Sequence, residues 1–200
     1  MRERRERQKE ELRQEILDAA REMFFEEGYE NVSMRKLAER IEYSPTTIYL
    51  HFKDKAELFN QLCDESFAKL ALRLEKLQKR LSRDPLAFLR EGLRAYIDFG
   101  LKHPHHYAVT FILAPTRGDD YQFQGSAGER AFSYMRGAVA LCVAKGELQT
   151  ADIDATAQAI WASIHGVTSL LITHKDFPFV PKNKLIEETI EMIVRGLQTR

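Results

Sequence analysis

Residues 33–55 read Ser-Met-Arg-Lys-Leu-Ala-Glu-Arg-Ile-Glu-Tyr-Ser-Pro-Thr-Thr-Ile-Tyr-Leu-His-Phe-Lys-Asp-Lys. Two short runs in this stretch have the apolar spacing of a helix, and each follows a serine that can act as an N-cap. The first run is lined on one face by Met34, Leu37, Ala38 and Ile41. In the second run Pro45 stands at the first helical position, where its missing N–H costs nothing. The stretch predicts two short helices joined by a tight turn.

Such a pair can place its second helix in the major groove of DNA if the two helices cross closely. Ala38 supplies the small residue at the crossing, Ile48 is expected to point inward, and Phe52 is expected to anchor the end of the second helix. The side chains left to face outward are Thr46, Thr47, Tyr49 and His51. Hydroxyl groups suit phosphates and several base edges, and methyl groups suit thymine.

The next helix is expected to begin at Asp54, its N-cap, with Lys53 and Lys55 beside it. Free N–H groups and the helix dipole at this point would add to the attraction of both lysines for phosphate. Five positive and three negative side chains in residues 33–55 leave a local charge of +2. A helical hairpin with a solvated polar face is the alternative interpretation of the same spacing.

The sequence on either side of this unit is helical as well. Apolar residues from Leu12 to Phe24 follow helical steps, and Gly28 ends that helix. Residues 1–10 carry five positive and three negative side chains and no apolar face, so they are either a solvated helix start or a basic arm that contacts phosphates or a minor groove. Further helices are expected at residues 55–81, 85–102, 129–144, 152–174 and 185–197, with a short segment up to residue 113 and a mobile loop at residues 114–128. The count is about nine helices and no strand, which predicts an all-α fold.

Composition limits the function classes. The chain has 200 residues, 44% of them hydrophobic and 30% charged, and a formal net charge of zero, so any affinity for nucleic acid must be local. Cys63 and Cys142 form no metal-ligand pair and no disulfide framework, which favours a reducing cytoplasm. The charged first residues argue against a secretory signal, and no apolar run reaches the roughly 18 residues of a membrane span.

The N-terminal sequence resembles the DNA-binding domain of TetR-family transcriptional regulators over about residues 12–60. The residues that carry the resemblance are Ile16-Leu17-Asp18-Ala19-Ala20, Phe24, Gly28-Tyr29, Ser33 to Ala38, Ser44 to Tyr49, Phe52, Lys55 and Leu58. The resemblance implies a three-helix DNA-binding domain, expected at residues 1–54, and a larger helical ligand-binding and dimerisation domain, expected at residues 55–200. It implies that Thr46, Thr47, Tyr49, His51 and Lys55 meet DNA and that Ser33 and Arg35 approach its backbone. The predicted DNA-binding set also includes Tyr43, Ser44, Pro45 and Lys53.

Two positions depart from the family pattern. Glu42 stands where the turn usually carries glycine, and Tyr43 stands where a small aliphatic residue is usual. A glutamate in a left-handed turn would cost about 1 kcal/mol relative to glycine. The departure puts the turn geometry in question, and Tyr43 is either an extra DNA contact or a contact between the helices.

The segment Trp161-Ala-Ser-Ile-His165-Gly166 resembles a motif of one TetR subgroup, where it lies on a helix of the dimer interface. Trp161 and His165 share a helix face, and Gly166 permits close approach of another helix. With the last helix this segment could pair with its copy as a four-helix bundle, which predicts a homodimer through residues 152–174 and 183–198. Packing inside one subunit is the alternative.

Aromatic residues are concentrated between residues 88 and 111, either as core or as the lining of an apolar ligand cavity with a few polar groups. The predicted ligand-binding residues are Phe88, Tyr96, Phe99, His103, His106, Tyr107, Phe111, Trp161 and His165. His103 and His106 could share a face toward a metal, but no carboxylate or thiolate lies at ligand spacing. Cys142 is either a redox sensor or a buried, inert thiol.

These features predict a homodimeric transcriptional repressor that a small apolar or amphipathic effector releases from DNA. Each subunit would place its 45–51 helix in successive major grooves of a pseudo-palindromic operator. An enzyme is disfavoured because the sequence has no nucleophile elbow, metal set or phosphate loop, and we expect no cofactor. A helical adaptor whose N-terminal hairpin binds protein remains the alternative.

Overall fold

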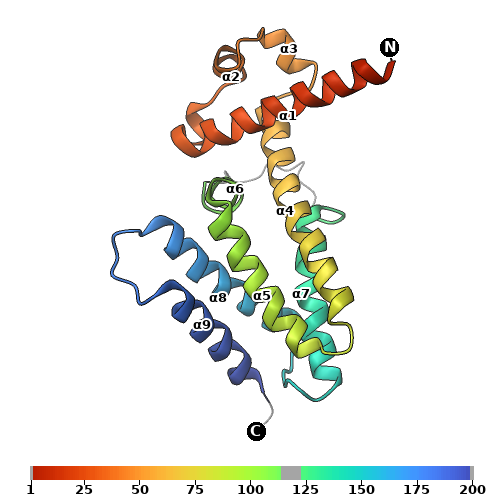
Figure 1. Ribbon diagram of the computed structural model, residues 1–200, viewed down its shortest axis with the longest axis vertical. Coiled ribbons are helices and arrows are strands. Elements are labelled where there is room, and N and C mark those ends of the chain that lie inside the picture. Colours follow the sequence, from red (N-terminus) through yellow and green to blue (C-terminus); the bar gives the residue numbers. More distant parts are fainter. Residues whose placement is uncertain (1, 114–122, 199–200) are drawn as a thin grey trace. The chain divides into compact units, whose positions relative to one another are not determined.

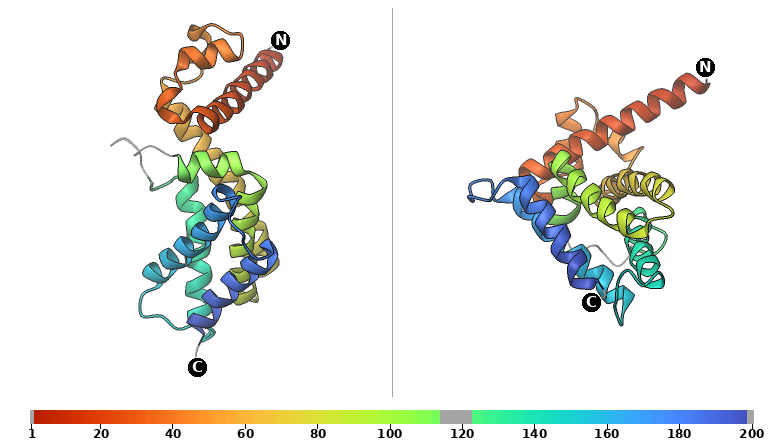
Figure 2. Two further views of the ribbon diagram at one scale, coloured as in Figure 1. Left: turned by 90° about the vertical axis from the view of Figure 1, so that its left-hand side faces the viewer. Right: turned by 60° about the horizontal axis from the view of Figure 1, so that its bottom comes forward.

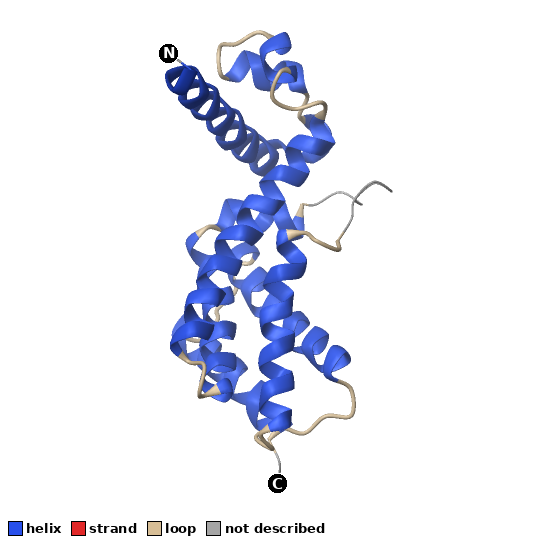
Figure 3. Ribbon diagram, turned by 90° about the vertical axis from the view of Figure 1, so that its right-hand side faces the viewer, coloured by secondary structure: helices blue, strands red, loops and turns tan. Residues whose placement is uncertain are grey.

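The computed structural model describes residues 2–113 and 123–198, and throughout these ranges the regular secondary structure is helical (Figure 1). The two ranges contain no strand beyond an isolated bridge between Leu148 and Gln198 (Figure 3). The all-α prediction is confirmed. No helix of the described ranges combines the length and apolarity of a membrane span.

The helices of the first half are α1 (Arg2–Glu27), the 3-10 turn η1 (Tyr29–Asn31), α2 (Met34–Arg40), α3 (Pro45–Tyr49), α4 (Lys55–Arg80) and α5 (Pro85–Lys102). They are followed by α6 (Pro104–Tyr107), the π-helical turn η2 (Ala108–Ile112), α7 (Ala127–Ala144), α8 (Ile153–Thr173) and α9 (Lys182–Leu197). The expected N-caps Ser33, Ser44 and Asp54 are confirmed, because each side-chain oxygen accepts a hydrogen bond from the backbone N–H three residues on. Asp84 and Asp152 cap α5 and α8 in the same way.

Some expected boundaries were wrong. The helix of α1 starts at Arg2, well before the apolar period that begins at Leu12. The expected loop at residues 114–128 is too long, because Ser126 caps α7 and the helix begins at Ala127. Residues 114–122 of that loop lie outside the described residues. The helix α9 begins at Lys182, directly after Pro181, rather than at residue 185.

The chain divides into two compact units, and the division falls inside α4. The first unit is Met1–Ser66 together with His105–Tyr121, and the second is Phe67–Pro104 together with Gln122–Arg200. The boundary between the two compact units therefore lies after Ser66. The expected boundary between a DNA-binding and a ligand-binding domain, between residues 54 and 55, stays a prediction.

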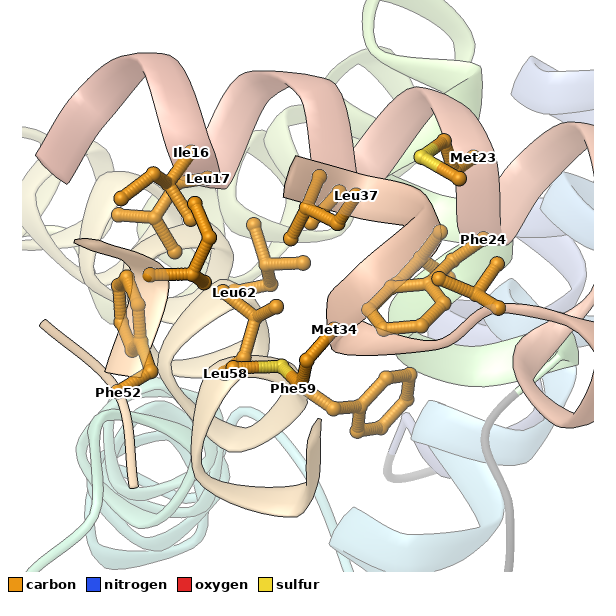
Figure 4. Close-up of a cluster of buried hydrophobic side chains, with 14 of the residues drawn as sticks. Ile16, Leu17, Met23, Phe24, Met34, Leu37, Phe52, Leu58, Phe59 and Leu62 are labelled. Carbon is orange, nitrogen blue, oxygen red and sulfur yellow. The ribbon is translucent and has the colours of Figure 1, made fainter. Parts of the chain in front are cut away.

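The first unit is built around a hydrophobic cluster that α1, α2, α3 and α4 share (Figure 4). Its largest fully buried members include Ile16, Leu17, Phe24, Leu37, Ile48, Phe52, Leu58 and Leu62. Each such aliphatic or aromatic side chain contributes about 1.5–3 kcal/mol through burial. Val109 of η2 joins the cluster, so this turn packs with the N-terminal helices.

The second unit is a helical bundle in which α5 packs against α7, α8 and α9 (Figure 2). The inward side of α9 is lined by Ile186, Ile190 and Val194, at steps of four residues. Ion pairs from Arg90 to Glu191 and from Arg94 to Glu187 join α5 to α9 at the edge of the packed surface.

Candidate nucleic-acid interface

The turn between α2 and α3 fixes the angle at which the second helix leaves the first. The N–H of Tyr43 donates to the carbonyl of Ala38 at 3.0 Å, and the N–H of Glu42 donates to Glu39 at 3.3 Å. This pair of hydrogen bonds is a Schellman motif, which requires a left-handed residue after the helix. Glu42 takes that conformation, with a φ of 59°. The turn therefore has a left-handed residue at the position where the family usually carries glycine, although that residue is Glu42.

Local bonds and burial together orient α3. Ser44 Oγ accepts from the N–H of Thr47 at 3.2 Å, and Pro45 occupies the first helical turn. Ile48 is fully buried and Phe52 nearly so, as predicted, and both belong to the N-terminal cluster. A helix of five residues has no stability of its own in water, so these contacts hold it.

The opposite side of α3 faces solvent. Thr46 is exposed, and Tyr43 and Tyr49 are 43% and 54% exposed. Leu50, at the C-cap of α3, is 74% exposed. Leu50 is absent from the predicted DNA-binding set, although its position next to Tyr49 could have indicated it. A leucine on a polar face suits the methyl group of thymine.

Thr47 is less exposed than its neighbour Thr46, and its hydroxyl group is engaged inside the domain. Its side chain is half-buried, and its Oγ1 lies 2.9 Å from Oγ of Ser44. The two hydroxyl groups therefore bond to each other at the start of α3 while each keeps acceptor capacity. Their predicted role in binding DNA stays a prediction.

His51 follows α3 and is half-buried. Burial lowers the pKa of this imidazole, and the positive charges of Lys9 and Arg13 lower it further, against an opposing effect of Glu10. Its buried Nδ1 has no hydrogen-bond partner in the described part of the chain. At neutral pH His51 is therefore an uncharged hydrogen-bonding group rather than a cation.

The start of α4 differs from the expectation of free N–H groups. The N–H of Glu57 donates to Asp54 Oδ1 at 2.8 Å, and the N–H of Lys53 donates to Glu57 Oε2 at 2.6 Å. The expectation is wrong for these two groups, because a reciprocal cap satisfies them. The side chain of Lys53 is exposed and stays available to a phosphate.

The ammonium group of Lys55 forms a hydrogen bond and a cation–π contact with Tyr29 of the same unit. Its Nζ donates to the carbonyl of Tyr29 at 2.9 Å and lies 4.1 Å from the centroid of the Tyr29 ring. This contact ties the start of α4 to η1. A contact with DNA by the same side chain stays a prediction.

The exposed residues at α2 that were expected near the DNA backbone are Ser33 and Arg35. Ser33 Oγ accepts from the N–H of Lys36, and Arg35 forms an exposed ion pair with Glu39 at 3.4 Å. Such a pair is weak in water and gives way readily to a phosphate.

The predicted ligand-binding residues fall in both compact units. In the second unit Tyr96 Oη accepts from Trp161 Nε1 at 3.2 Å and lies 3.3 Å from His165 Nδ1. Phe88 and Phe99 are buried there, and the Phe99 ring lies 5.3 Å from that of His103. The hydroxyl group of Tyr96 therefore joins α5 to α8, and the Phe99–His103 contact lies at the end of α5 itself.

The remaining members belong to the first unit. His106 Nδ1 lies 3.1 Å from Ser66 Oγ, and the rings of Tyr107 and Phe111 are 4.9 Å apart. Tyr107 is fully buried and therefore part of the core. Residues 2–113 and 123–198 contain no group of three histidine, cysteine or acidic side chains placed to hold a metal.

Both parts of the chain match models of one protein family. Residues 16–62 match the model described as bacterial regulatory proteins of the tetR family, and residues 89–197 match the tetracyclin repressor-like C-terminal domain. The second match alone covers more than half of the chain.

Curated relatives align with the N-terminal part. The transcriptional regulator AcrR of Shigella flexneri is 35% identical over 83 residues, which are 42% of this chain and 39% of AcrR. The transcriptional repressor AcnR of Corynebacterium diphtheriae is 46% identical over 59 residues, which are 30% of this chain and 31% of AcnR. The matched segments thus span less than half of these relatives.

Solved structures share the fold over nearly the whole chain. PfmR from Thermus thermophilus, a TetR-family transcriptional regulator, superposes with a TM-score of 0.72 at 21% identity, over 93% of this chain and 97% of that one. FadR from Bacillus subtilis in complex with stearoyl-CoA gives a TM-score of 0.71 at 20% identity, over 92% and 98%. At such identities the likeness establishes the fold alone.

Proposed function

The chain belongs to the TetR family of bacterial regulatory proteins, and from this premise we propose that it is a DNA-binding transcriptional repressor released by a small effector. The observation that carries the proposal is α3, a short helix that buries Ile48 and turns a polar and aromatic face to solvent. Tyr43, Tyr49 and Leu50 leave apolar area in water on this face, and its burial against a partner would stabilise a complex.

Each exposed group on α3 has a role in the proposed complex. The hydroxyl group of Thr46 contacts a base edge or phosphate, and Tyr49 donates its phenol to a phosphate while its ring packs on the sugar. Leu50 contacts a thymine methyl group. His51, uncharged at neutral pH, acts as a hydrogen-bonding group. Arg35 and Lys53 fix the position of the domain through the backbone.

We propose a homodimer through α8 and α9, which supplies two reading helices for a pseudo-palindromic operator. The outward side of α8 carries small and apolar side chains at helical steps, namely Ala155, Ala159, Ala162, Gly166 and Leu170. Apart from its own turn of helix, a Cβ added at Gly166 would meet no described atom within 4 Å, so the glycine is not needed for close packing against another helix of the subunit. On α9, Met192 is 70% exposed. Both observations favour a second copy over intramolecular packing.

The effector is proposed to be apolar or amphipathic and to bind in the C-terminal unit. The group of Tyr96, Trp161 and His165 would supply its polar contacts, as the few polar groups of an apolar site usually do. The fold shared with FadR, whose structure holds stearoyl-CoA, supports a ligand of this kind. Two of these three residues, Trp161 and His165, belong to the Trp-x-x-x-His-Gly motif that Gly166 completes, and we propose that the chain falls in that subgroup.

Release requires only that the effector bind better to a conformation whose two reading helices no longer match the groove spacing. A coupling free energy of about 1–3 kcal/mol between the two sites is typical. Neither DNA binding nor this coupling involves a cofactor, and both take place in the cytoplasm.

The test begins with selection of an operator from a pool of random duplexes. We expect a pseudo-palindromic sequence whose affinity falls steeply with salt. Replacing Tyr49 with alanine should weaken operator binding about tenfold, equivalent to about 1.4 kcal/mol, and leave the free energy of unfolding within about 0.5 kcal/mol. Phe177→Ala, which removes an aromatic ring of similar exposure from the second unit, is the control and should bind normally.

A protein-binding adaptor would give the opposite result. It would select no duplex, and Tyr49→Ala would change no DNA affinity. Selection of a single sequence by the native chain, together with normal binding by Tyr49→Ala, would leave DNA binding in place but remove α3 as its reading helix.

A further inference from the structure

The first turns of α1 extend beyond the core that the rest of the helix covers. The described side chains of residues 3–11 are all exposed, and the first partly buried residue is Leu12. Ten helical residues span about 15 Å. Figure 1 shows this part of α1 continuing past α2 and α3 as an uninterrupted helix.

The cationic side chains of this extension are distributed over two opposite faces. Arg5, Lys9 and Arg13 follow steps of four, and the same side of the helix continues into the buried Ile16 and Ala20. These three cations therefore lie on the side of α1 that packs against the DNA-binding unit.

The other face begins with Arg4 and Arg7 and continues through Glu11, Gln14 and Asp18. All of these side chains are exposed, and Arg7 lies 3.5 Å from Glu11 in an ion pair. This face looks away from the core of the unit.

Contacts with the end of α3 place the first face beside the reading helix. The guanidinium carbon of Arg13 lies 4.8 Å from the centroid of the Phe52 ring, a cation–π contact. Lys9 and Arg13 both act on His51, the residue before Phe52, and lower its pKa in addition to the larger effect of burial. The cations next along this face, toward the N-terminus, are Lys9 and Arg5.

This face carries positive charge that the unit does not neutralise. Arg5, Lys9 and Arg13 form no ion pair with any other described residue, and like charges four residues apart on one face repel and destabilise a helix. The carboxylate of Glu10 also acts on His51 and raises its pKa, against the effect of the two cations. An anionic partner would remove the repulsion within the row.

We propose that the N-terminal extension of α1 is a rigid phosphate-binding arm in which Arg5 and Lys9 contact the DNA backbone beside the half-site that α3 reads. The inference rests on the proposed function, because it requires that α3 binds duplex DNA. A preformed helix loses less conformational entropy on binding than a disordered arm does. The contacts are to phosphate, so they raise affinity for any duplex and leave the choice of sequence to α3.

Two double variants with the same change in charge test the arm. Arg5→Ala with Lys9→Ala removes two cations from the proposed contact face, and Arg4→Ala with Arg7→Ala removes two from the opposite face. Alanine favours the helix, so both variants keep α1 folded, as circular dichroism would verify. Fluorescence anisotropy gives their affinity for the selected operator and for an unrelated duplex at 50–200 mM salt.

We expect the first variant to bind both duplexes at least about fivefold more weakly in 0.1 M salt. Its salt dependence should be shallower by roughly 0.9 for each phosphate that the arm no longer neutralises. The second variant should stay within about twofold of the native chain. Equal losses of affinity in the two variants would mean a general charge effect and would overturn the arm, as would normal binding by the first.

The failure of the proposed function is distinguishable from the failure of the arm. A native chain that binds no duplex overturns both. A native chain that selects an operator, combined with two variants that behave alike, overturns the arm alone.

Discussion

Glu42 holds the turn between α2 and α3 in a left-handed conformation that disfavours any residue with a Cβ. Replacing it with glycine should stabilise the protein by about 0.5–1 kcal/mol, because relief of this strain exceeds the entropy that the more flexible unfolded chain gains. Urea unfolding followed by circular dichroism measures the change. The turn itself should persist, since its two hydrogen bonds involve only backbone groups.

Glu39→Gly is the matched control, because Glu39 lies within helix α2 three residues earlier. Glycine there should destabilise the protein by about 1 kcal/mol. Changes of the same sign at both positions would contradict the explanation by left-handed strain.

Single residues differ in how far their roles follow from sequence. Ser33 and Ser44 could be predicted as caps because each bonds to a backbone group three positions away. The role of Lys55 could not, because its partner Tyr29 lies 26 positions earlier and meets it only in the folded unit. The neutral state of His51 depends on burial and on Lys9, which is even more remote in sequence.

At the scale of elements, the contact between α4 and η1 depends on Lys55. Lys55→Met keeps an apolar stem but leaves the Tyr29 carbonyl with only its longer hydrogen bond from the N–H of Val32, at 3.4 Å, and removes the cation–π contact. We expect a loss of about 1–3 kcal/mol in the free energy of unfolding. Lys53→Met, which removes an exposed lysine two positions away, should stay within about 0.5 kcal/mol.

The same two variants separate packing from DNA binding. If Lys55 acts mainly on phosphate, Lys55→Met would make the salt dependence of operator binding shallower and leave stability unchanged. If it acts mainly by packing, stability falls, and the salt dependence changes only in Lys53→Met.

The contact between α5 and α8 should make stability depend on pH. Burial lowers the pKa of His165 below its ordinary value of 6.5. Between the two pKa values His165 is protonated more in the unfolded chain than in the folded chain. The free energy of unfolding is therefore highest above pH 6.5 and falls as the pH drops toward the lowered pKa. Trp161, the only tryptophan, has its ring 6.1 Å from His165 and reports unfolding of this region by fluorescence.

His165→Gln should lose less stability than the native chain between pH 7.5 and pH 5.5. His174→Gln, which replaces an exposed histidine one residue past α8, should follow the native chain. An equal pH dependence in all three proteins would show that His165 is not the group responsible.

The helices also differ in how well their bounds could be predicted from the sequence. α1 was expected from Leu12 because only there does an apolar period begin. Its first ten residues are helical through propensity, being rich in Glu, Arg and Gln, and through pairs such as Arg7 with Glu11. The five-residue α3 was recognisable from Ser44 and Pro45, although its stability comes from Ile48 and Phe52 in the shared core.

At the scale of the whole molecule, the two compact units share one continuous helix, α4. Sequence reasoning could predict a DNA-binding unit followed by a helical body. It could not predict that residues 105–112 join the first unit, because Val109 meets the N-terminal cluster and His105 stacks on Phe25 at 3.8 Å only through long-range packing. The predicted ligand set divides between the units for the same reason.

The proposed dimer predicts that a large side chain at Gly166 will separate the two subunits. Gly166→Leu puts a large side chain on the proposed dimer face of α8, where no described atom outside the same turn of helix lies within 4 Å of the new Cβ. Each subunit should therefore fold normally while the dimer dissociates at least about tenfold more readily, since close helix approach tolerates little added volume. Sedimentation should change from twice 23.2 kDa toward 23.2 kDa, and operator affinity should fall with it.

Gly137→Leu is the matched control, because Gly137 lies within α7 and an added Cβ there also meets nothing within 4 Å. It should leave both mass and operator binding unchanged, since α7 takes no part in the proposed interface. A Gly166→Leu protein that stays dimeric would exclude α8 as the contact between subunits. A monomeric Gly166→Leu protein that binds the operator as tightly as the native chain would show that one reading helix suffices. That result would contradict the proposal that a dimer reads both halves of a pseudo-palindromic operator.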